Sequence, residues 1–417
     1  MKHPPSVPLV LVLALLTAVT PFAVDMYMSA FPQMAAEFDT TASVVQLTLT
    51  TFLAGLAVGQ LVIGQLSDRL GRRRPLLAGI VVCLLASVAC AMAPSIEILV
   101  GLRFVQGFAG AAGVVIARAI ITDRAEGTRA VQLYAVMMVI GVLAPIVAPV
   151  AGGLVVAEFG WRAVFYVLSG LNLLMFVGAY LLAAESLPEA DRRPAGLRAF
   201  ADSAGSVLGN RRFLGYALAL GAASAAMFAY ISASPFVLQN IVGLSPRTYA
   251  LTFGACALAV AASGIVSARL VRSIAPRTLL LGGVGAMVVA ATAMLLNVVV
   301  AGVVPWLTIT LMACFMGTVG FIFSNATALA VGEVRHAAGT GSAILGFLQY
   351  ALGAIASPLV GLAGQHSAVP MAVVMLTCAV AAATALLVLT RGRDAVETSD
   401  PSVPTLSPVS AGGTRNR

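Results

Sequence analysis

Twelve long apolar segments, separated by short polar connections, limit the fold of this chain more than any other feature. A helix that crosses a lipid bilayer needs roughly 20 mostly apolar residues. The segments lie at about residues 8–33, 43–66, 76–94, 98–121, 131–156, 163–184, 213–237, 247–268, 278–300, 304–330, 341–364 and 368–390. Membrane β-strands would be about 10 residues long with alternating polarity. The sequence therefore predicts an all-α membrane protein with twelve transmembrane helices.

The composition agrees with a chain that is solvated by lipid. The residues are 60% apolar and 10% charged, whereas a soluble domain is about 45–50% apolar and about 25% charged. A soluble enzyme, a disordered chain and a disulfide-rich secreted domain are therefore excluded. The five cysteines lie in apolar runs without CxxC spacing, so no metal site is expected. No nucleic-acid partner is predicted, because the net charge of +8 comes from connections and not from a basic soluble module.

Lysine and arginine are distributed unevenly between the two sets of connections. Membrane proteins keep these residues in cytoplasmic loops. Twenty of them fall in the set that includes both termini, and only Arg162 and Arg247 fall in the other set. The sequence thus predicts a multi-pass protein of the bacterial inner (cytoplasmic) membrane with both termini in the cytoplasm.

The longest polar stretch between two predicted helices divides the chain after the sixth span. We predict an N-terminal six-helix half at 1–184, a cytoplasmic linker at 185–212, a C-terminal six-helix half at 213–390 and a disordered cytoplasmic tail at 391–417. The tail is rich in Ser, Pro, Thr and Gly, which is typical of disorder.

Two short repeats relate the halves. YMSAFP at 27–32 is echoed by YISASP at 230–235, and GQLSDRL at 64–70 is echoed by GIVSARL at 264–270. Their shared order and nearly equal offset indicate a duplication, and hence two pseudo-symmetric halves. Transporters built from parallel repeats bind their substrate between the repeats, near the middle of the bilayer.

Asp25 falls inside a predicted span, whereas the other fifteen of the sixteen acids can be placed in connections or at span ends. An ionisable group within a span is a functional candidate because burying it is expensive. A carboxyl group balanced between burial and a nearby cation can exchange a proton near neutral pH. The candidate cation is Arg103. From the helical rise per residue, Arg103 lies roughly 7–9 Å from the outer end of its span, and Asp25 lies roughly 12–15 Å from the outer end of its own span. The alternative is a fixed salt bridge between two helices.

A cluster of charges is predicted at the cytoplasmic ends of the second and fourth spans. It comprises Gly64, Asp68, Arg69, Gly71, Arg72 and Arg73 of the loop GQLSDRLGRRR, together with Arg118 and Asp123 of the fourth span. Gly64 permits close helix approach and Gly71 permits a tight turn. Such a cluster can latch the two halves in one state. The alternative is that its arginines only anchor the topology.

The fifth span contains VLAPIVAPVAGGL at 142–154. Pro145 and Pro149 interrupt the backbone hydrogen bonds of a helix, and Gly152 and Gly153 make it thin. The pattern favours a bent helix against which another helix packs closely. A simple packing kink would give the same pattern.

These motifs together resemble the major facilitator superfamily, and within it the 12-span drug:proton antiporters. The loop at 64–74 matches GxLxDRxGRRR, and LRFVQGFAGA at 102–111 is similar to the motif of the family's fourth span. Alanines at 144 and 148 replace the glycines of the antiporter motif. That departure, with DMYMSAFP at 25–32 and GWRAVF at 160–165, resembles the bicyclomycin-resistance and chloramphenicol-efflux (Bcr/CflA) branch. The resemblance covers about residues 8–390.

The resemblance implies alternating access driven by inward proton movement, without a cofactor. It makes Asp25 the proton carrier, Arg103 its charge partner, and Asp68, Arg72 and Asp123 the cytoplasmic gate. The motif of the fifth span would favour the exchange of drug for protons over a leak across the membrane. We expect a monomer whose central cavity is lined by spans 1, 4, 7 and 10.

The substrate pocket is predicted from the polar, aromatic and polarizable side chains of those four spans. They are Tyr27, Met28, Gln106, Tyr230 and Asn325. Apolar surroundings with a few polar groups suit a drug-sized amphiphile. No second buried acid is present, so a neutral or weakly polar substrate is expected, and the branch suggests a bicyclomycin-like or phenicol-like antibiotic.

Three other functions compete with drug efflux. Proton-coupled uptake or export of a small metabolite by the same fold would require more polar residues in the spans than this chain has. A membrane enzyme would need paired acids or a nucleophile with a base, and the spans supply one lone acid. A sensor with this fold that transports nothing is not distinguished by the sequence.

Overall fold

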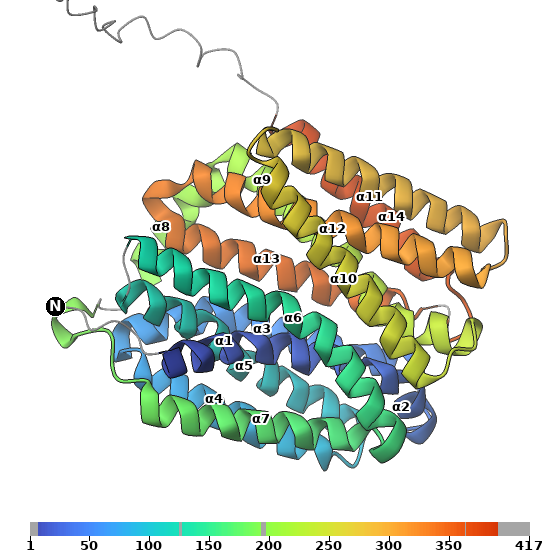
Figure 1. Ribbon diagram of the computed structural model, residues 1–417, viewed down its shortest axis with the longest axis horizontal. Coiled ribbons are helices and arrows are strands. Elements are labelled where there is room, and N and C mark those ends of the chain that lie inside the picture. Colours follow the sequence, from blue (N-terminus) through green and yellow to red (C-terminus); the bar gives the residue numbers. More distant parts are fainter. Residues whose placement is uncertain (1–6, 125–126, 193–196, 363, 391–417) are drawn as a thin grey trace, which may run out of the picture.

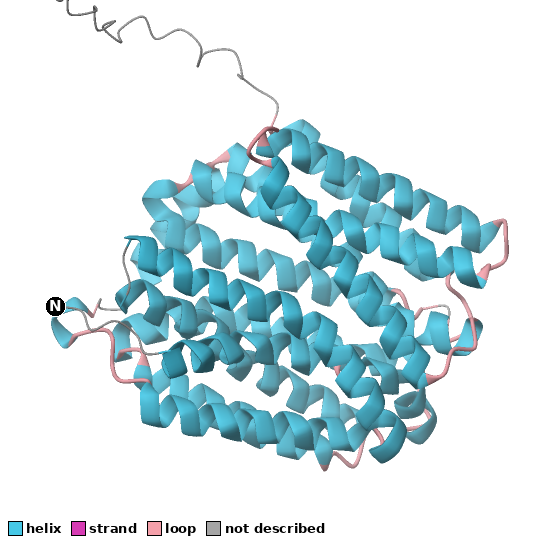
Figure 2. Ribbon diagram, in the orientation of Figure 1, coloured by secondary structure: helices cyan, strands magenta, loops and turns pink. Residues whose placement is uncertain are grey.

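The computed structural model describes residues 7–124, 127–192, 197–362 and 364–390, so the predicted tail at 391–417 lies outside the described residues. The described part is helical and holds no strand (Figures 1 and 2). The α-helices are α1 Val7–Asp25, α2 Phe31–Glu37, α3 Ala42–Leu70, α4 Arg73–Ala91, α5 Ile96–Arg124, α6 Gly127–Phe159, α7 Trp161–Leu182, α8 Leu197–Gly209, α9 Arg211–Pro235, α10 Pro246–Leu270, α11 Pro276–Val299, α12 Pro305–Glu333, α13 Ala338–Leu359 and α14 Val369–Leu389. Among the described residues, twelve spans are long and apolar enough to cross a membrane, which confirms the predicted number.

Capping side chains and prolines determine where several of the helices begin. The side chains of Thr41, Asn210 and Ser245 accept hydrogen bonds from backbone N–H groups in the first turns of α3, α9 and α10. Such caps satisfy donors that have no partner within the helix. Prolines at the starts of α10, α11 and α12 cost no backbone hydrogen bond, because the first N–H groups of a helix have no partner within the helix.

The helices form two packed halves, α1–α7 and α9–α14. Across their boundary α3 packs along α13, and α6 packs along α10 (Figure 1). We call one end of the bundle the Arg-rich end; it holds Arg69, Arg124, Arg211, Arg269 and Arg335. The opposite, Arg-poor end holds Glu37, Met92, Phe159, Ile241 and Val300. Arg211 donates a hydrogen bond to the carbonyl of Val388 (3.0 Å), so α14 ends beside the start of α9 at the Arg-rich end.

Two spans are not regular α-helices, which the sequence did not predict. The first span runs over Pro8–Glu37 but breaks after Asp25, continues as a 3₁₀ turn η1 (Met28–Ala30) and resumes as α2. The seventh span continues from Pro235 into a π-helical turn η3 (Phe236–Ile241). Such 3₁₀ and π segments within helices frequently mark functional sites.

The polar stretch predicted as a linker also contains structure. It holds the helix α8, which packs against α9 and α13. The sequence offered only mixed polarity there, because the face of α8 that contacts the other helices is short.

Candidate functional site

Asp25 is the last residue of α1, directly before the break in the first span. Its side chain is 6% exposed. Within the described residues it has neither a hydrogen-bond partner nor a counter-ion. The fixed salt bridge that the sequence left as an alternative is therefore not seen in the described part of the chain.

The other half of the molecule surrounds this break. The turn η1, which follows Asp25, packs against α6 of its own half and against α9 and α10 of the C-terminal half. The phenol groups of Tyr230 and Tyr249 lie within electrostatic reach of Asp25. The Asp25 carboxyl group therefore sits at the boundary between the halves.

Arg103 is placed by the close contact of α3 with α5. A Cβ atom on Gly107 would lie 2.0 Å from the Phe52 carbonyl oxygen, and one on Gly55 would lie 2.2 Å from the Phe104 carbonyl oxygen. Only glycine allows the two backbones to approach this closely. The approach buries the Arg103 side chain completely, at 0% exposure, inside the N-terminal half.

The Arg103 guanidinium group is held by neutral acceptors and not by Asp25. It donates to Gln106 Oε1 (2.6 Å), to the Ala23 carbonyl (2.9 Å) and to the Thr48 carbonyl (3.4 Å). It also lies over the rings of Tyr27 and Phe52, at 4.3 Å from each centroid. Carbonyl oxygens and aromatic faces together stabilise a buried cation. The structure thus does not bring the two predicted proton-coupling side chains into contact.

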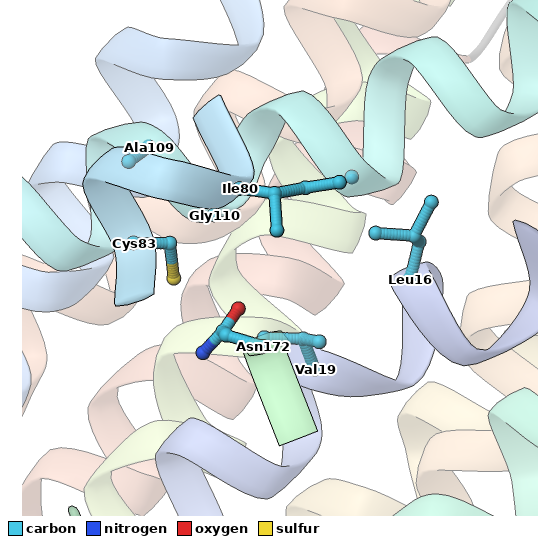
Figure 3. Close-up of a pocket in the computed structure, with 8 residues that line it drawn as sticks. Leu16, Val19, Ile80, Cys83, Ala109, Gly110 and Asn172 are labelled. Carbon is cyan, nitrogen blue, oxygen red and sulfur yellow. The ribbon is translucent and has the colours of Figure 1, made fainter. Parts of the chain in front are cut away.

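A chain of buried polar groups leads away from Arg103. Gln106 donates to Ser87 Oγ (2.7 Å), and Ser87 donates to the Cys83 carbonyl (2.7 Å). Cys83 and Asn172 face each other across a cavity of about 10 Å³ with apolar walls (Figure 3). That volume holds about one water molecule. The cavity lies within the N-terminal half, so it is not a drug-sized pocket between the halves.

The charge cluster at the Arg-rich end is assembled as an Arg72-centred network. Arg72 forms an ion pair with Asp68, donates to Ser67 Oγ (2.8 Å), and pairs with Asp123 at 3.1 Å. Burial alone would lower the pKa of Arg72, but its bonds to Asp123 and Asp68 outweigh burial and raise that pKa. Arg72 thus joins the end of α3 to the last turns of α5.

The remaining predicted gate residues have separate surroundings. Arg73 donates to the Tyr180 carbonyl (3.0 Å) on α7. Arg69 and Arg118 are exposed. A Cβ on Gly64 would meet Val115 at an ordinary 3.6 Å, so no close helix approach depends on Gly64. The expectation for Gly64 was wrong, because the tight contacts of α3 fall earlier in the helix, at Gly55 and Gly59.

Glu185 belongs to the same network, although the sequence gave no sign of it. Its carboxylate accepts hydrogen bonds from the backbone N–H groups of Arg72 (2.8 Å) and Arg73 (3.2 Å), at the start of α4. The neighbouring Ser186 donates to Asp123 Oδ2 (2.9 Å). Burial would raise the pKa of Glu185, but the backbone N–H groups outweigh it and lower that pKa. Gly71 (φ 87°) leaves the room that this carboxylate needs.

Glu185→Gln should loosen this attachment of the linker. The variant keeps one acceptor oxygen but loses the negative charge at a helix N-terminus, which costs roughly 1 kcal/mol. Because the folded-state pKa of Glu185 is lowered, its contribution is present above the usual carboxyl pKa and disappears as the pH falls through the lowered value. Thermal unfolding of both proteins between pH 7 and pH 3 should show two curves that converge in acid. The exposed Glu189→Gln should match the wild type throughout, and a constant difference would contradict the role of the charge.

The motif of the fifth span lies where three helices meet. α6 runs unbroken through Pro145 and Pro149. A Cβ on Gly152 would lie 2.0 Å from the Met26 carbonyl oxygen, and one on Gly153 would lie 2.3 Å from Ala250 Cβ. The glycine pair therefore seats α6 between the break in the first span and α10 of the other half.

The predicted pocket residues are all buried but do not share one surface. Met28 in η1 and Tyr230, whose ring stacks on Phe253 (5.6 Å), lie with Asp25 at the boundary. The Tyr27 hydroxyl is hydrogen-bonded to Thr48, and the Tyr27 ring lies against the Arg103 guanidinium group. Arg103 also donates a hydrogen bond to Gln106. Asn325 donates to Ser267 Oγ (2.8 Å) within the C-terminal half.

The fold and the site define a class of protein. The described residues form twelve candidate membrane helices in two packed halves and hold, at the boundary, a buried acid that has no partner among them. This arrangement is typical of a membrane transporter that alternates between two packings of its halves.

The chain belongs to the Major Facilitator Superfamily, whose sequence pattern matches residues 13–358. It is 37% identical to the uncharacterized MFS-type transporter YdgK of Bacillus subtilis, over 92% of this chain and 96% of that protein. It is 30% identical to the bicyclomycin resistance protein homolog of Haemophilus influenzae (91% and 96%) and 26% identical to the multidrug resistance protein MdtL of Klebsiella pneumoniae (89% and 93%). These matches confirm the resemblance found in the sequence.

Solved structures show the same fold. A bacterial homolog of the human lysosomal transporter Spinster, in an inward-facing and occupied conformation, superposes with a TM-score of 0.69 at 17% identity, covering 91% of this chain and 94% of that one. The D-xylose-proton symporter also has a TM-score of 0.69, at 14% identity, covering 90% and 96%. The predicted fold of two six-helix halves is thereby confirmed.

Proposed function

We propose that this protein, as a monomer and without a cofactor, exports a small amphiphilic antibiotic or drug across the bacterial cytoplasmic membrane in exchange for protons. The observation that carries the proposal is Asp25, a buried acid at the boundary between the halves that has no partner in the described part of the chain. An acid that both halves enclose in one state can be exposed to either side as the halves repack, which is what a proton carrier requires. The bicyclomycin-resistance and multidrug-resistance names of the relatives support a drug as the cargo.

The proposed substrate is neutral or weakly polar, such as a bicyclomycin-like or phenicol-like compound. Among the described residues, Asp25 is the only acid that is buried. A fixed cation would need a carboxylate of its own while Asp25 carries the proton. The neighbouring rings of Tyr230, Tyr249 and Phe253 supply apolar surface with hydroxyl groups, which suits an uncharged amphiphile.

The proposed orientation places the Arg-rich end in the cytoplasm. Arginines are retained on the cytoplasmic side of membrane proteins. The Arg72 network with Asp68, Asp123 and Glu185 would then be the cytoplasmic gate, since it joins the ends of α3 and α5 to the linker between the halves.

Asp25→Asn should abolish coupling. Inside-out vesicles with an acidic lumen and a pH-sensitive dye would receive a bicyclomycin or a phenicol. Drug-triggered loss of protons from the lumen is expected for the wild type and absent for Asp25→Asn, because an amide cannot carry the proton. Glu97→Gln, which changes an exposed acid on α5, should behave as the wild type.

Two outcomes would contradict the proposal. Equal proton release by wild type and Asp25→Asn would make Asp25 structural. If neither drug releases protons from the wild type, the drug assignment fails, and uptake of labelled metabolites by right-side-out vesicles would test the alternative of metabolite transport.

A further inference from the structure

Each of the repeated segments YMSAFP and YISASP accepts a hydrogen bond from a glutamine of the opposite half, so the two bonds across the boundary are reciprocal. Ser29 and Ser232 occupy the same position in the two repeats. Gln239 of the C-terminal half donates to the Ser29 carbonyl (3.1 Å), and Gln46 of the N-terminal half donates to the Ser232 carbonyl (3.2 Å). Each half thus offers a glutamine to the equivalent serine of the other half.

Both bonds lie toward the Arg-poor end of the bundle. Gln46 is in the second turn of α3, and Gln239 is in η3, at the far end of the seventh span (Figure 1). The rings of Phe31 and Phe236 meet beside them, with centroids 6.0 Å apart. A Cβ on Gly361 would lie 2.3 Å from Gln46 Oε1, so the turn that follows α13 also packs tightly against Gln46. At this end the halves are in direct contact.

The closed contact leaves polar atoms unsatisfied. Ser29 Oγ and Gln46 Oε1 are buried without a hydrogen-bond partner among the described residues. An unsatisfied buried polar atom costs free energy that water would recover. Opening of the Arg-poor end would hydrate both atoms. Their burial therefore offsets part of the stabilisation from the two glutamine bonds, and the contact is suited to break and form repeatedly.

One of the two bonds joins two irregular segments of the described bundle. Ser29 lies in the 3₁₀ turn η1, and Gln239 lies in the π turn η3. Neither turn has the regular i to i−4 hydrogen bonds of an α-helix, so each can change its path at less cost than an α-helix. The Gln239 bond therefore connects the parts of the first and seventh spans that are best able to move, and the Gln46 bond joins the α-helices α3 and α9 beside them.

We propose that Gln46 and Gln239 are positioning residues that form a reciprocal latch closing the Arg-poor end, and that the latch must open for the substrate to leave. The proposal rests on the proposed function, because only an exporter oriented as above releases its substrate at this end. The two glutamines bind the carbonyls of Ser232 and Ser29 and not Asp25, so the latch acts on the packing of the halves and not on the proton itself.

The test measures access to Ser29 from each side of the membrane. Ser29→Cys is a suitable reporter. The two side chains are nearly isosteric, and the Ser29 hydroxyl has no hydrogen-bond partner among the described residues that the substitution would remove. Right-side-out and inside-out vesicles would be treated with a membrane-impermeant maleimide, and labelling of the wild type without the reporter would be subtracted. Gln46→Met and Gln239→Met remove one donor each while keeping the side-chain volume. Each should raise labelling from the outside by about fivefold, the shift expected for one net hydrogen bond.

Asn240→Leu provides the matched control. Asn240 follows Gln239 in η3 but donates to Gln365 within its own half (3.1 Å). Asn240→Leu should leave the labelling of the Ser29→Cys reporter from the outside unchanged. Unchanged labelling in both glutamine variants, or an equal rise in Asn240→Leu, would overturn the latch. Two variants on opposite halves keep the test decisive if one of them fails to insert, which size-exclusion chromatography would reveal.

Failure of the latch and failure of the proposed function give different results. A rise in labelling confined to inside-out vesicles would overturn the orientation and with it the release of substrate at this end. A rise from the outside, together with absent drug-triggered proton release in the wild type, would support the latch and reject the drug exchange.

Discussion

Gly152→Ala should abolish transport, whereas Gly141→Ala in the same helix should be tolerated. The methyl group added at Gly152 would lie 2.0 Å from the Met26 carbonyl oxygen and 2.4 Å from the Met26 Cα. Both atoms are backbone, so no side-chain rotation relieves the clash. Met26 directly follows Asp25 at the break in the first span, so the displacement reaches the proposed proton site.

The expected energetic cost is large for one methyl group. Overpacking in a well-packed core costs about 1–3 kcal/mol and more where backbone must shift. A Cβ on Gly141 meets nothing within 4 Å. There the gain in helix propensity should even stabilise α6, by up to about 1 kcal/mol. The two substitutions therefore have identical chemistry and opposite expected signs.

Thermal unfolding in detergent and drug-triggered proton release in inside-out vesicles would both be measured. Gly152→Ala should lower the unfolding temperature and remove proton release, and Gly141→Ala should retain both. Normal transport by Gly152→Ala would show that α6 does not press on the Met26 backbone in the working protein. Equal losses in both variants would indicate a general intolerance of α6 to alanine.

The twelve spans and the Arg72 network were predictable because their signals are local. The length of an apolar run follows from the bilayer thickness. Asp68 and Arg72 lie four residues apart in the chain, so even the approximate position of their ion pair could be inferred. Asp123, at the end of another span, could be added because span ends on one side of a membrane lie at the same level.

The break after Asp25 and the attachment of Glu185 were not predictable from local signals. Proline in a span suggests a kink, but the 3₁₀ turn at Met28–Ala30 forms against α6, about a hundred residues or more further along the chain. Glu185 binds backbone N–H groups of Arg72 and Arg73. Every residue except proline has such a group, so no pattern of side chains identifies this partner.

Arg103 illustrates the same limit and leads to a second strong prediction. The sequence identified it as a buried cation and suggested Asp25 as its partner. The structure supplies two backbone carbonyls and the Gln106 side chain instead. A conformational clamp that joins α5 to α1 and α3 would explain those contacts without any acid.

Arg103→Met should destabilise the N-terminal half severely. It would leave the Ala23 carbonyl and Gln106 Oε1 without the donor that Arg103 supplies, at about 1–3 kcal/mol for each buried unsatisfied group. The Thr48 carbonyl would still accept a hydrogen bond from Thr51 (3.4 Å). It would also remove the cation from the faces of Tyr27 and Phe52. Arg103→Lys should be intermediate, because an ammonium group keeps the charge but lacks the planar fork that reaches several acceptors. The exposed Arg272→Met should unfold as the wild type does.

Unfolding temperatures of the three variants, with proton release as the functional measurement, would check this order. A wild-type unfolding temperature for Arg103→Met would contradict the clamp, and so would equal values for Arg103→Lys and Arg103→Met. A double-mutant cycle with Asp25→Asn separates the clamp from a counter-ion. If Arg103 and Asp25 formed an ion pair in the resting state, the two substitutions would couple strongly, by about 1 kcal/mol or more. Because the guanidinium group is occupied by neutral acceptors, we expect a coupling below about 0.5 kcal/mol, and any pairing of the two side chains would then belong to another state of the transport cycle.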